Sequence, residues 1–227
     1  NGLTKVGVLS GSGGFDQSCH GDVVALAPKH GVEIVADEAH GKGDTDMTPQ
    51  LTKIKNTAGV QAFLYCGFGA PTSIVAKNYK QIGMTIPHYQ THGSASMRVI
   101  KGADGAAEGV RLPAAALLVV DQLPDSHPQK KVASAYKKAY EARYNDSIST
   151  FGGHAYDALM ILVKALEEVG ADREKVRDAI ENMQGFVGTG GVFNFSAEDH
   201  NGLGLDAFEM LTAEVADAPD YAHRQGV

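Results

Sequence analysis

Hydrophobic and polar positions along the first part of the chain follow a strand–loop–helix order. An apolar run, Lys5–Ser10, breaks at the small-residue loop Gly11–Gly14, and a helical pattern follows from about Gln17 to Lys29. A short alternating stretch, Val32–Ala36, then reads as a second strand. Alternation of strands with amphipathic helices is typical of a parallel α/β sheet, which is the fold class we expect.

The same alternation continues to about residue 100. Thr48-Pro49 reads as an N-cap followed by proline at the first helical position, and it predicts a helix that ends near Asn56. A buried strand is predicted next at Val60–Cys66, followed by a helix over about Ala70–Ile82 that Gly83 ends. A short strand at Ile86–Gln90 and a weak helix over about Met97–Ile100 come after it.

The second half of the chain is mostly helical in its pattern. After a strand and crossing at Gly109–Val120, helices are predicted over about Gln129–Tyr144, Gly153–Val169 and Asp172–Met183. The helix Gly153–Val169 has only a narrow polar stripe, so we expect it to be covered on most sides. Strands follow at Val192–Phe195 and Leu205–Ala213, and the last residues are expected to be frayed.

Composition excludes several classes of protein. A length of 227 residues allows one large domain or two small ones, and 43% hydrophobic residues argue against disorder. A net charge of −7 argues against partners that need a basic face, such as nucleic acid or an anionic membrane. The longest apolar run, Ala114–Val120, falls short of the ~20 residues that span a bilayer. The first residues lack the charged and apolar segments of a signal peptide. Since a mature chain has lost its signal peptide, this observation does not place the protein in the cytoplasm.

Three predicted strands end in small-residue loops that each carry one ring. Phe15 follows the first strand, Phe68 follows Val60–Cys66, and His92 follows Ile86–Gln90. The carboxyl ends of parallel strands lie at one edge of a sheet, where ligands of such folds bind. We therefore expect these loops to form a binding surface. The alternative is that both phenylalanines pack under their own loops and that His92 is an ordinary surface residue.

No motif of catalysis or metal binding is apparent. Gly11–Gly14 lacks the third glycine of a dinucleotide fingerprint and the Gly-Lys of a P-loop. No nucleophile elbow or paired-carboxylate constellation appears, so we predict neither an enzyme nor a cofactor. His88 and His92 flank a β-like stretch after Pro87, which disfavours a shared metal. Cys19 and Cys66 form no metal motif; whether they pair is left open by the sequence.

The order of motifs resembles the type I periplasmic solute-binding proteins of ABC transporters, in their branched-chain amino-acid (leucine-isoleucine-valine-binding) family. The resemblance covers nearly the whole chain. It is carried by Lys5–Ser10 with its aromatic loop, Gly43-Asp44-Thr45-Asp46 followed by Gln50–Lys55, Val60–Gly69, Glu108-Gly109-Val110, Tyr156-Asp157-Ala158, and Gly190–Phe195 followed by Gly202.

The resemblance implies a two-lobed fold of which part is missing. Residues 1–116 and 208–227 would form the α/β second lobe, and 117–207 a mostly helical remnant of the first lobe without its N-terminal segment. Helices that lose their sheet would expose apolar side chains, so we expect self-association through residues 129–183.

The resemblance also implies a function. Members of this family are extracytoplasmic receptors that bind a small solute between two lobes and deliver it to a membrane permease, and they catalyse no reaction. Two alternatives stay open at this point: the ligand-sensing domain of a regulator, and a flavodoxin-like or Rossmann-like enzyme domain that binds a phosphorylated cofactor at the first loop.

Four ligand-binding residues follow from matching positions in the family. Phe15 and Phe68 occupy the two positions that present aromatics, and Phe151 matches an aromatic of the other lobe, although it could also belong to the core. His92 stands where an acidic residue often pairs with the ligand's amino group. An imidazole suits a carboxylate better than an ammonium. We therefore expect a small apolar or aromatic carboxylate, with a branched-chain amino-acid-like ligand as the wider class.

Overall fold

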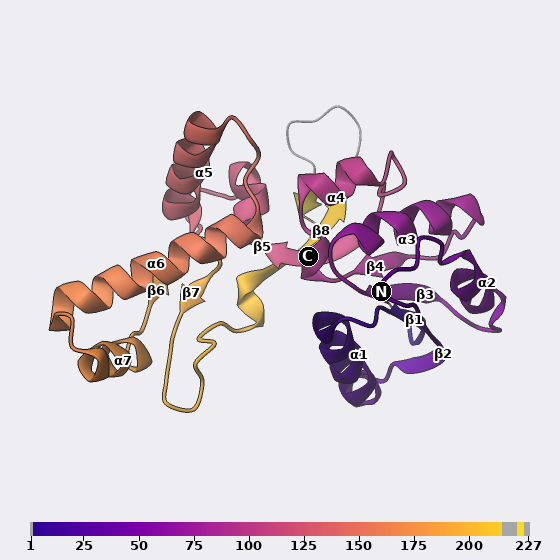
Figure 1. Ribbon diagram of the computed structural model, residues 1–227, viewed down its shortest axis with the longest axis horizontal. Coiled ribbons are helices and arrows are strands. Elements are labelled where there is room, and N and C mark those ends of the chain that lie inside the picture. The colour runs from indigo at the N-terminus through magenta and orange to yellow at the C-terminus, as the bar shows by residue number, and fades with distance from the viewer. Residues whose placement is uncertain (1, 215–221, 225–227) are drawn as a thin grey trace. The chain divides into compact units, whose positions relative to one another are not determined.

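The computed structural model describes residues 2–214 and 222–224 and divides the chain into two compact units (Figure 1). Unit 1 begins at the N-terminus and runs to Pro113, and the chain re-enters it at Leu211. Unit 2 comprises Ala114–Met210 and, near the C-terminus, the segment that begins at His223. The predicted frayed tail, and with it part of the predicted second lobe, lies outside the described residues at 215–221 and 225–227.

The main sheet has the strand order β2-β1-β3-β4-β5-β8-β9. The pairs β1/β2, β1/β3, β3/β4 and β4/β5 are all parallel, which confirms the expected α/β class. The strands cover β1 (Lys5–Ser10), β2 (Glu33–Ala39), β3 (Ala62–Cys66), β4 (His88–Gln90), β5 (Arg111–Ala115), β8 (Phe208–Ala213) and β9 (Ala222–Arg224).

The core of unit 1 lies between the sheet and two of its helices. The helices are α1 (Gly14–Leu26, continued by a 3-10 turn at Ala27–His30), α2 (Thr48–Asn56), α3 (Ala70–Gln81) and α4 (Met97–Gly102). Leu51 and Ile54 of α2 and Val75 of α3 pack with Phe63 and Tyr65 of β3, all with no exposed surface. Each such side chain contributes about 1.5–3 kcal/mol on burial. In contrast, α1 buries none of its residues.

The prediction that Thr48 caps α2 is wrong by one position. Met47 is the N-cap and Thr48 is the first helical residue. The carboxylate of Asp46 accepts the Thr48 amide at 2.8 Å, so this side chain takes the role expected of a capping threonine. Met47 is fully buried in the core, which explains why an apolar residue holds the cap position.

His88 is enclosed in the core of unit 1. Its ring lies 4.9 Å from that of Phe63 and 4.7 Å from that of Tyr79. The Gln90 amide lies 3.3 Å from Nε2 and donates to it, so the proton sits on Nδ1, which has no partner in the part of the chain that the structure describes. Because burial disfavours the charged imidazolium, the pKa of His88 falls to about 3.

This burial predicts a loss of stability in acid. Below pH 6.5 the unfolded chain protonates His88 while the folded chain does not until about pH 3. The free energy of unfolding should therefore decrease between these values by up to about 1.4 kcal/mol per pH unit. We expect His88→Leu to flatten this part of a pH series of urea unfolding. The variant His30→Leu, at an exposed histidine, should keep the wild-type slope, and parallel profiles for wild type and His88→Leu would contradict the prediction.

Unit 2 packs two helices against a short hairpin. Its elements are a 3-10 segment at Ala116–Gln122, α5 (Lys130–Tyr144), α6 (Thr150–Val169), α7 (Arg173–Glu181), and the antiparallel strands β6 (Phe186–Val187) and β7 (Val192–Phe193). Ile161 and Ala165 of α6 meet Phe193, Phe195 and Met183 in a small core, with α7 packed against it (Figure 1). The sequence did not reveal β6, and the strand predicted to reach Phe195 ends at Phe193, where Asn194 turns to bond Gly202.

One face of α6 is buried and the other is not. Thr150, Gly153, Asp157, Ile161 and Ala165 recur at helical spacing on the buried face. Phe151, Leu159, Leu162 and Leu166 are exposed. The expected cover on most sides of this helix is therefore absent among the described residues.

A buried carboxylate joins α6 to the β6–β7 turn. Asp157 accepts the backbone amides of Thr189 and Gly190, each at 2.7 Å, and the Thr189 hydroxyl at 3.1 Å. Gln129 completes the anchor because its side-chain amide donates to the carbonyls of Gly188 and Thr189. A Cβ on Gly188 would lie 2.7 Å from the Asp157 carboxyl carbon, so this turn requires glycine there.

We predict that Asp157→Ala destabilises unit 2 by about 2–4 kcal/mol, because it leaves two buried amides and a hydroxyl without an acceptor. Asp178→Ala is a matched control, since Asp178 lies on the exposed side of α7 and pairs with the exposed Arg177. This control should change the free energy of unfolding by at most about 0.5 kcal/mol. Urea unfolding followed by circular dichroism measures both, and equal effects would contradict the prediction.

Candidate ligand-binding site

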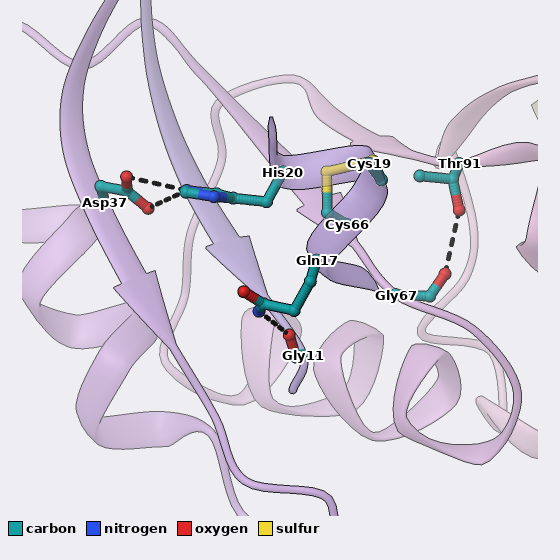
Figure 2. The surroundings of a disulfide bond; sticks show 8 residues. All are labelled: Gly11, Gln17, Cys19, His20, Asp37, Cys66, Gly67 and Thr91. Carbon is teal, nitrogen blue, oxygen red and sulfur yellow. Dashed lines mark hydrogen bonds and ion pairs between the residues drawn. A yellow bond between two sulfur atoms is a disulfide. The ribbon is translucent and has the colours of Figure 1, made fainter. Parts of the chain in front are cut away.

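The register of the sheet brings three loops of unit 1 to one edge. Ser10 at the end of β1 pairs with Cys66 at the end of β3, and Tyr65 pairs with Gln90 at the end of β4. The loops are also bonded to one another: the Gly11 amide donates to the Cys66 carbonyl at 3.0 Å. The Thr91 hydroxyl donates to the Gly67 carbonyl at 2.9 Å (Figure 2).

The three rings predicted for this edge lie together. Phe15 is in the first turn of α1, Phe68 precedes α3, and His92 follows β4. The Phe15 ring centroid is 6.0 Å from that of Phe68 and 5.5 Å, edge-on, from that of His92. Phe15 is 38% and Phe68 50% exposed, so neither folds under its own loop. We call Phe15, Phe68 and His92 the ring cluster.

Gly93 makes the close approach of these rings possible. A Cβ at this position would lie 3.2 Å from Phe68 and 3.5 Å from Phe15, so the backbone after His92 packs directly against both rings. The ring cluster is therefore a half-exposed aromatic surface packed against the backbone at Gly93.

Phe151, the fourth predicted contact, belongs to unit 2. It is the second residue of α6, two positions after the N-cap Ser149, and is 49% exposed. It is therefore not part of the core of its own unit, which was the alternative reading.

A disulfide joins the first loop region to β3. Cys19 of α1 and Cys66 at the end of β3 are bonded, with their Cα atoms 5.8 Å apart and a separation of 47 positions in the sequence (Figure 2). Sequence spacing left this pairing open, because only the parallel register places the start of α1 over the end of β3.

A buried polar network lies beneath the edge, and sequence reasoning missed it. His40 Nδ1 donates to the Gly41 carbonyl at 2.8 Å, so its Nε2 accepts the Tyr65 hydroxyl at 2.9 Å. Burial, and to a lesser degree the negative charge of Asp16, raises the pKa of the Tyr65 phenol, which therefore stays a hydrogen-bond donor. Gly67 passes over the Tyr65 ring so closely that a Cβ would collide with it.

The glycine loop 11–14 is organised around a carboxylate of its own chain. Asp16 Oδ2 accepts the Gly13 amide at 3.0 Å, and a Cβ on Gly11 would lie 2.2 Å from the same oxygen. A phosphate at this loop would meet that negative charge and would compete for that amide. The geometry therefore disfavours the phosphate-binding alternative.

A cavity of about 500 Å³ extends from the ring cluster along α1. Phe15 and His92 line it at the carboxyl edge, and Val6 and Val32 line it near the opposite ends of β1 and β2. The space between α1 and the sheet is thus incompletely filled, in agreement with the absence of buried residues on that helix.

Two further findings concern the residues that the structure describes. No three His, Cys, Asp or Glu side chains among them gather where they could hold a metal ion. None of the helices formed by these residues has both the length and the apolar character needed to cross a membrane.

Comparison with known proteins identifies the family. A family model described as "Periplasmic binding protein" matches residues 1–210. The chain belongs to this family. The family binds solutes and is not one of enzymes, and membership implies a periplasmic location.

Individual relatives support this assignment. The chain is 26% identical over 171 residues to the leucine-, isoleucine-, valine-, threonine- and alanine-binding protein of Pseudomonas aeruginosa, which covers 73% of this chain and 43% of that protein. An extracellular ligand-binding receptor from Rhodopseudomonas palustris HaA2 matches with a TM-score of 0.88 at 26% identity, over 100% of this chain and 64% of that structure.

More distant structures show the shared fold alone. The leucine-binding protein LivK from Thermotoga maritima matches with a TM-score of 0.78 at 19% identity, over 99% of this chain and 60% of that one. The chain thus spans less than half of its curated relative and less than two thirds of these structures.

Proposed function

We propose that this chain is the ligand-binding part of a solute receptor that delivers a small apolar or aromatic carboxylate to the membrane permease of an ABC importer. The observation that carries the proposal is the ring cluster at the carboxyl edge of the sheet. In this reading, unit 1 corresponds to the second lobe of the family and unit 2 to the remainder of the first lobe.

The chemistry of the cluster favours an apolar acid over an α-amino acid. Two tilted phenylalanine rings offer apolar surface and edge-to-face contacts to an aromatic or branched group. The His92 imidazole can donate a hydrogen bond to a carboxylate. An ammonium would need a nearby acceptor, and the carboxylate closest in sequence to Phe15, that of Asp16, already accepts the Gly13 amide.

By resemblance to the family, we assign a further aromatic contact to Phe151. Binding would be coupled to a hinge motion between the two lobes, and the permease would recognise the closed form. The named binding activity of the Pseudomonas relative makes a branched-chain amino acid the competing ligand. The alternative role of a ligand sensor in a regulator uses the same site and differs only in the partner.

A thermal-shift and calorimetric screen tests the ligand class. We expect benzoate-like acids to raise the unfolding temperature, because a ligand at 100 times its Kd adds about 2.7 kcal/mol to the stability of the folded state. Leucine and valine should bind more weakly than these acids. Tighter binding of leucine or valine than of benzoate would refute the aromatic-acid proposal.

The variant His92→Asp should reverse this preference. It introduces a carboxylate that attracts the ammonium of an amino acid and repels an acid, so the ratio of benzoate to leucine affinity should fall by about tenfold or more. His92→Gln is the matched control, because it keeps a hydrogen-bond donor and adds no charge. An equal change in both variants would show that the charge at this position does not set the specificity.

We also propose that the chain self-associates through the exposed apolar side of residues 129–183, which includes Leu159, Leu162 and Leu166. Light scattering should give a mass above that of a monomer, and the variant Leu159→Glu/Leu162→Glu should lower it. A monomeric mass without binding of a dye specific for apolar surface would contradict this.

A further inference from the structure

We infer that the Cys19–Cys66 disulfide is a positioning element of the ring cluster: it fixes Phe15 against Phe68 and so preorganises the ligand surface. The inference rests on the proposed function for its consequence on binding. Its structural part, the fixed geometry of the two rings, stands on the contacts of unit 1 alone.

The bond connects the bases of the two loops that carry the rings. Cys19 follows Phe15 by four residues, one turn along α1, so the two side chains share a face of the helix. Cys66 ends β3 and precedes Phe68 by two residues. The covalent path from one ring to the other therefore runs through one helical turn, one disulfide and two residues of loop.

Other interactions hold α1 only weakly. The helix buries no residue, and the cavity of about 500 Å³ separates part of it from Val6 and Leu64 of the sheet. His20 in the middle of α1 forms a polar contact with Asp37 of β2 at 2.9 Å, and this pair is partly exposed (Figure 2). A partly exposed pair of this kind contributes little to stability. The disulfide is thus a covalent restraint on the position of Phe15, beside noncovalent contacts such as the hydrogen bond from the Gln17 side-chain amide to the Gly11 carbonyl at 2.7 Å.

The third loop is connected to the same point. Thr91 bonds the carbonyl of Gly67, the residue after Cys66, and Gly93 packs against both phenylalanine rings. Figure 2 shows the disulfide beside this bond. All three loops of the ring cluster therefore meet within a few residues of the disulfide.

The consequence for binding is a lower entropic cost. A ring that is already fixed loses little freedom when a ligand contacts it, whereas a mobile ring must be ordered by the ligand. Without the disulfide, ordering Phe15 and its helical turn should weaken binding by about 5- to 150-fold.

The test compares three samples: the wild-type protein with its disulfide intact, the double variant Cys19→Ser/Cys66→Ser, and the wild-type protein after mild reduction with dithiothreitol. Dithiothreitol breaks the sulfur–sulfur bond, transfers two electrons and two protons to give two thiols, and is itself oxidised to its cyclic disulfide. The first readout needs no ligand: nuclear Overhauser contacts between the ring protons of Phe15 and Phe68. The second is the affinity for benzoate.

A variant in the core contact of α2 serves as a control, because it lowers the stability of the fold without removing the disulfide that is proposed to position Phe15. Ile54→Ala or Ile54→Val, whichever matches the serine variant in urea unfolding, lowers stability in a core to which α1 contributes no buried residue. We expect the ring contacts and the benzoate affinity to survive in this control and to be lost or weakened in the serine variant and in the reduced protein.

Ring contacts that persist in the reduced protein would overturn the inference, and so would their absence from the oxidised wild type. If the serine variant does not fold, reduction of the folded wild type decides the question. If the wild type binds no benzoate while the ring contacts depend on the disulfide, the aromatic-acid proposal fails and the positioning role stands.

Discussion

The parallel pairing of β1, β3 and β4 is the constraint on which the rest of unit 1 depends. Ser10 is opposite Cys66 and Tyr65 is opposite Gln90, so three loops leave the sheet at the same edge. The grouping of Phe15, Phe68 and His92 follows from that register. A shift of one residue in β3 would reverse which side chains face the core, and it would move Cys66 away from Cys19.

The two faces of this sheet are stabilised in different ways. On the face of α2 and α3, fully buried apolar side chains such as Leu51 and Phe63 provide the stability. The helix α1 has no buried residue, and a disulfide and a few polar contacts hold it instead. The rings that we propose for ligand binding lie between these two regions: Phe15 belongs to the loosely packed α1, and Phe68 and His92 follow the core strands β3 and β4.

Unit 2 shows the same reliance on a few specific interactions. Its apolar core is small, and the carboxylate of Asp157 fixes the β6–β7 turn through the amides of Thr189 and Gly190. Buried polar groups of this kind specify one conformation, because each alternative leaves an unpaired donor or acceptor. The opposite face of α6 is different, because its exposed leucines are not covered by other residues that the structure describes.

The α/β class, the position of most elements and the grouping of Phe15, Phe68 and His92 at one edge could all be predicted from the amino-acid sequence alone. These depend on hydrophobic periodicity and on the rule that parallel strands share an edge, which are local or general properties. In contrast, three contacts become visible in the folded chain alone: the pairing of Cys19 with Cys66, the buried network of Tyr65 and His40, and the anchoring by Asp157 of a turn 32 residues away. Each of these interactions joins residues far apart in sequence, and their side chains carry no periodic signal, so the register and packing of the folded chain alone bring them within bonding distance.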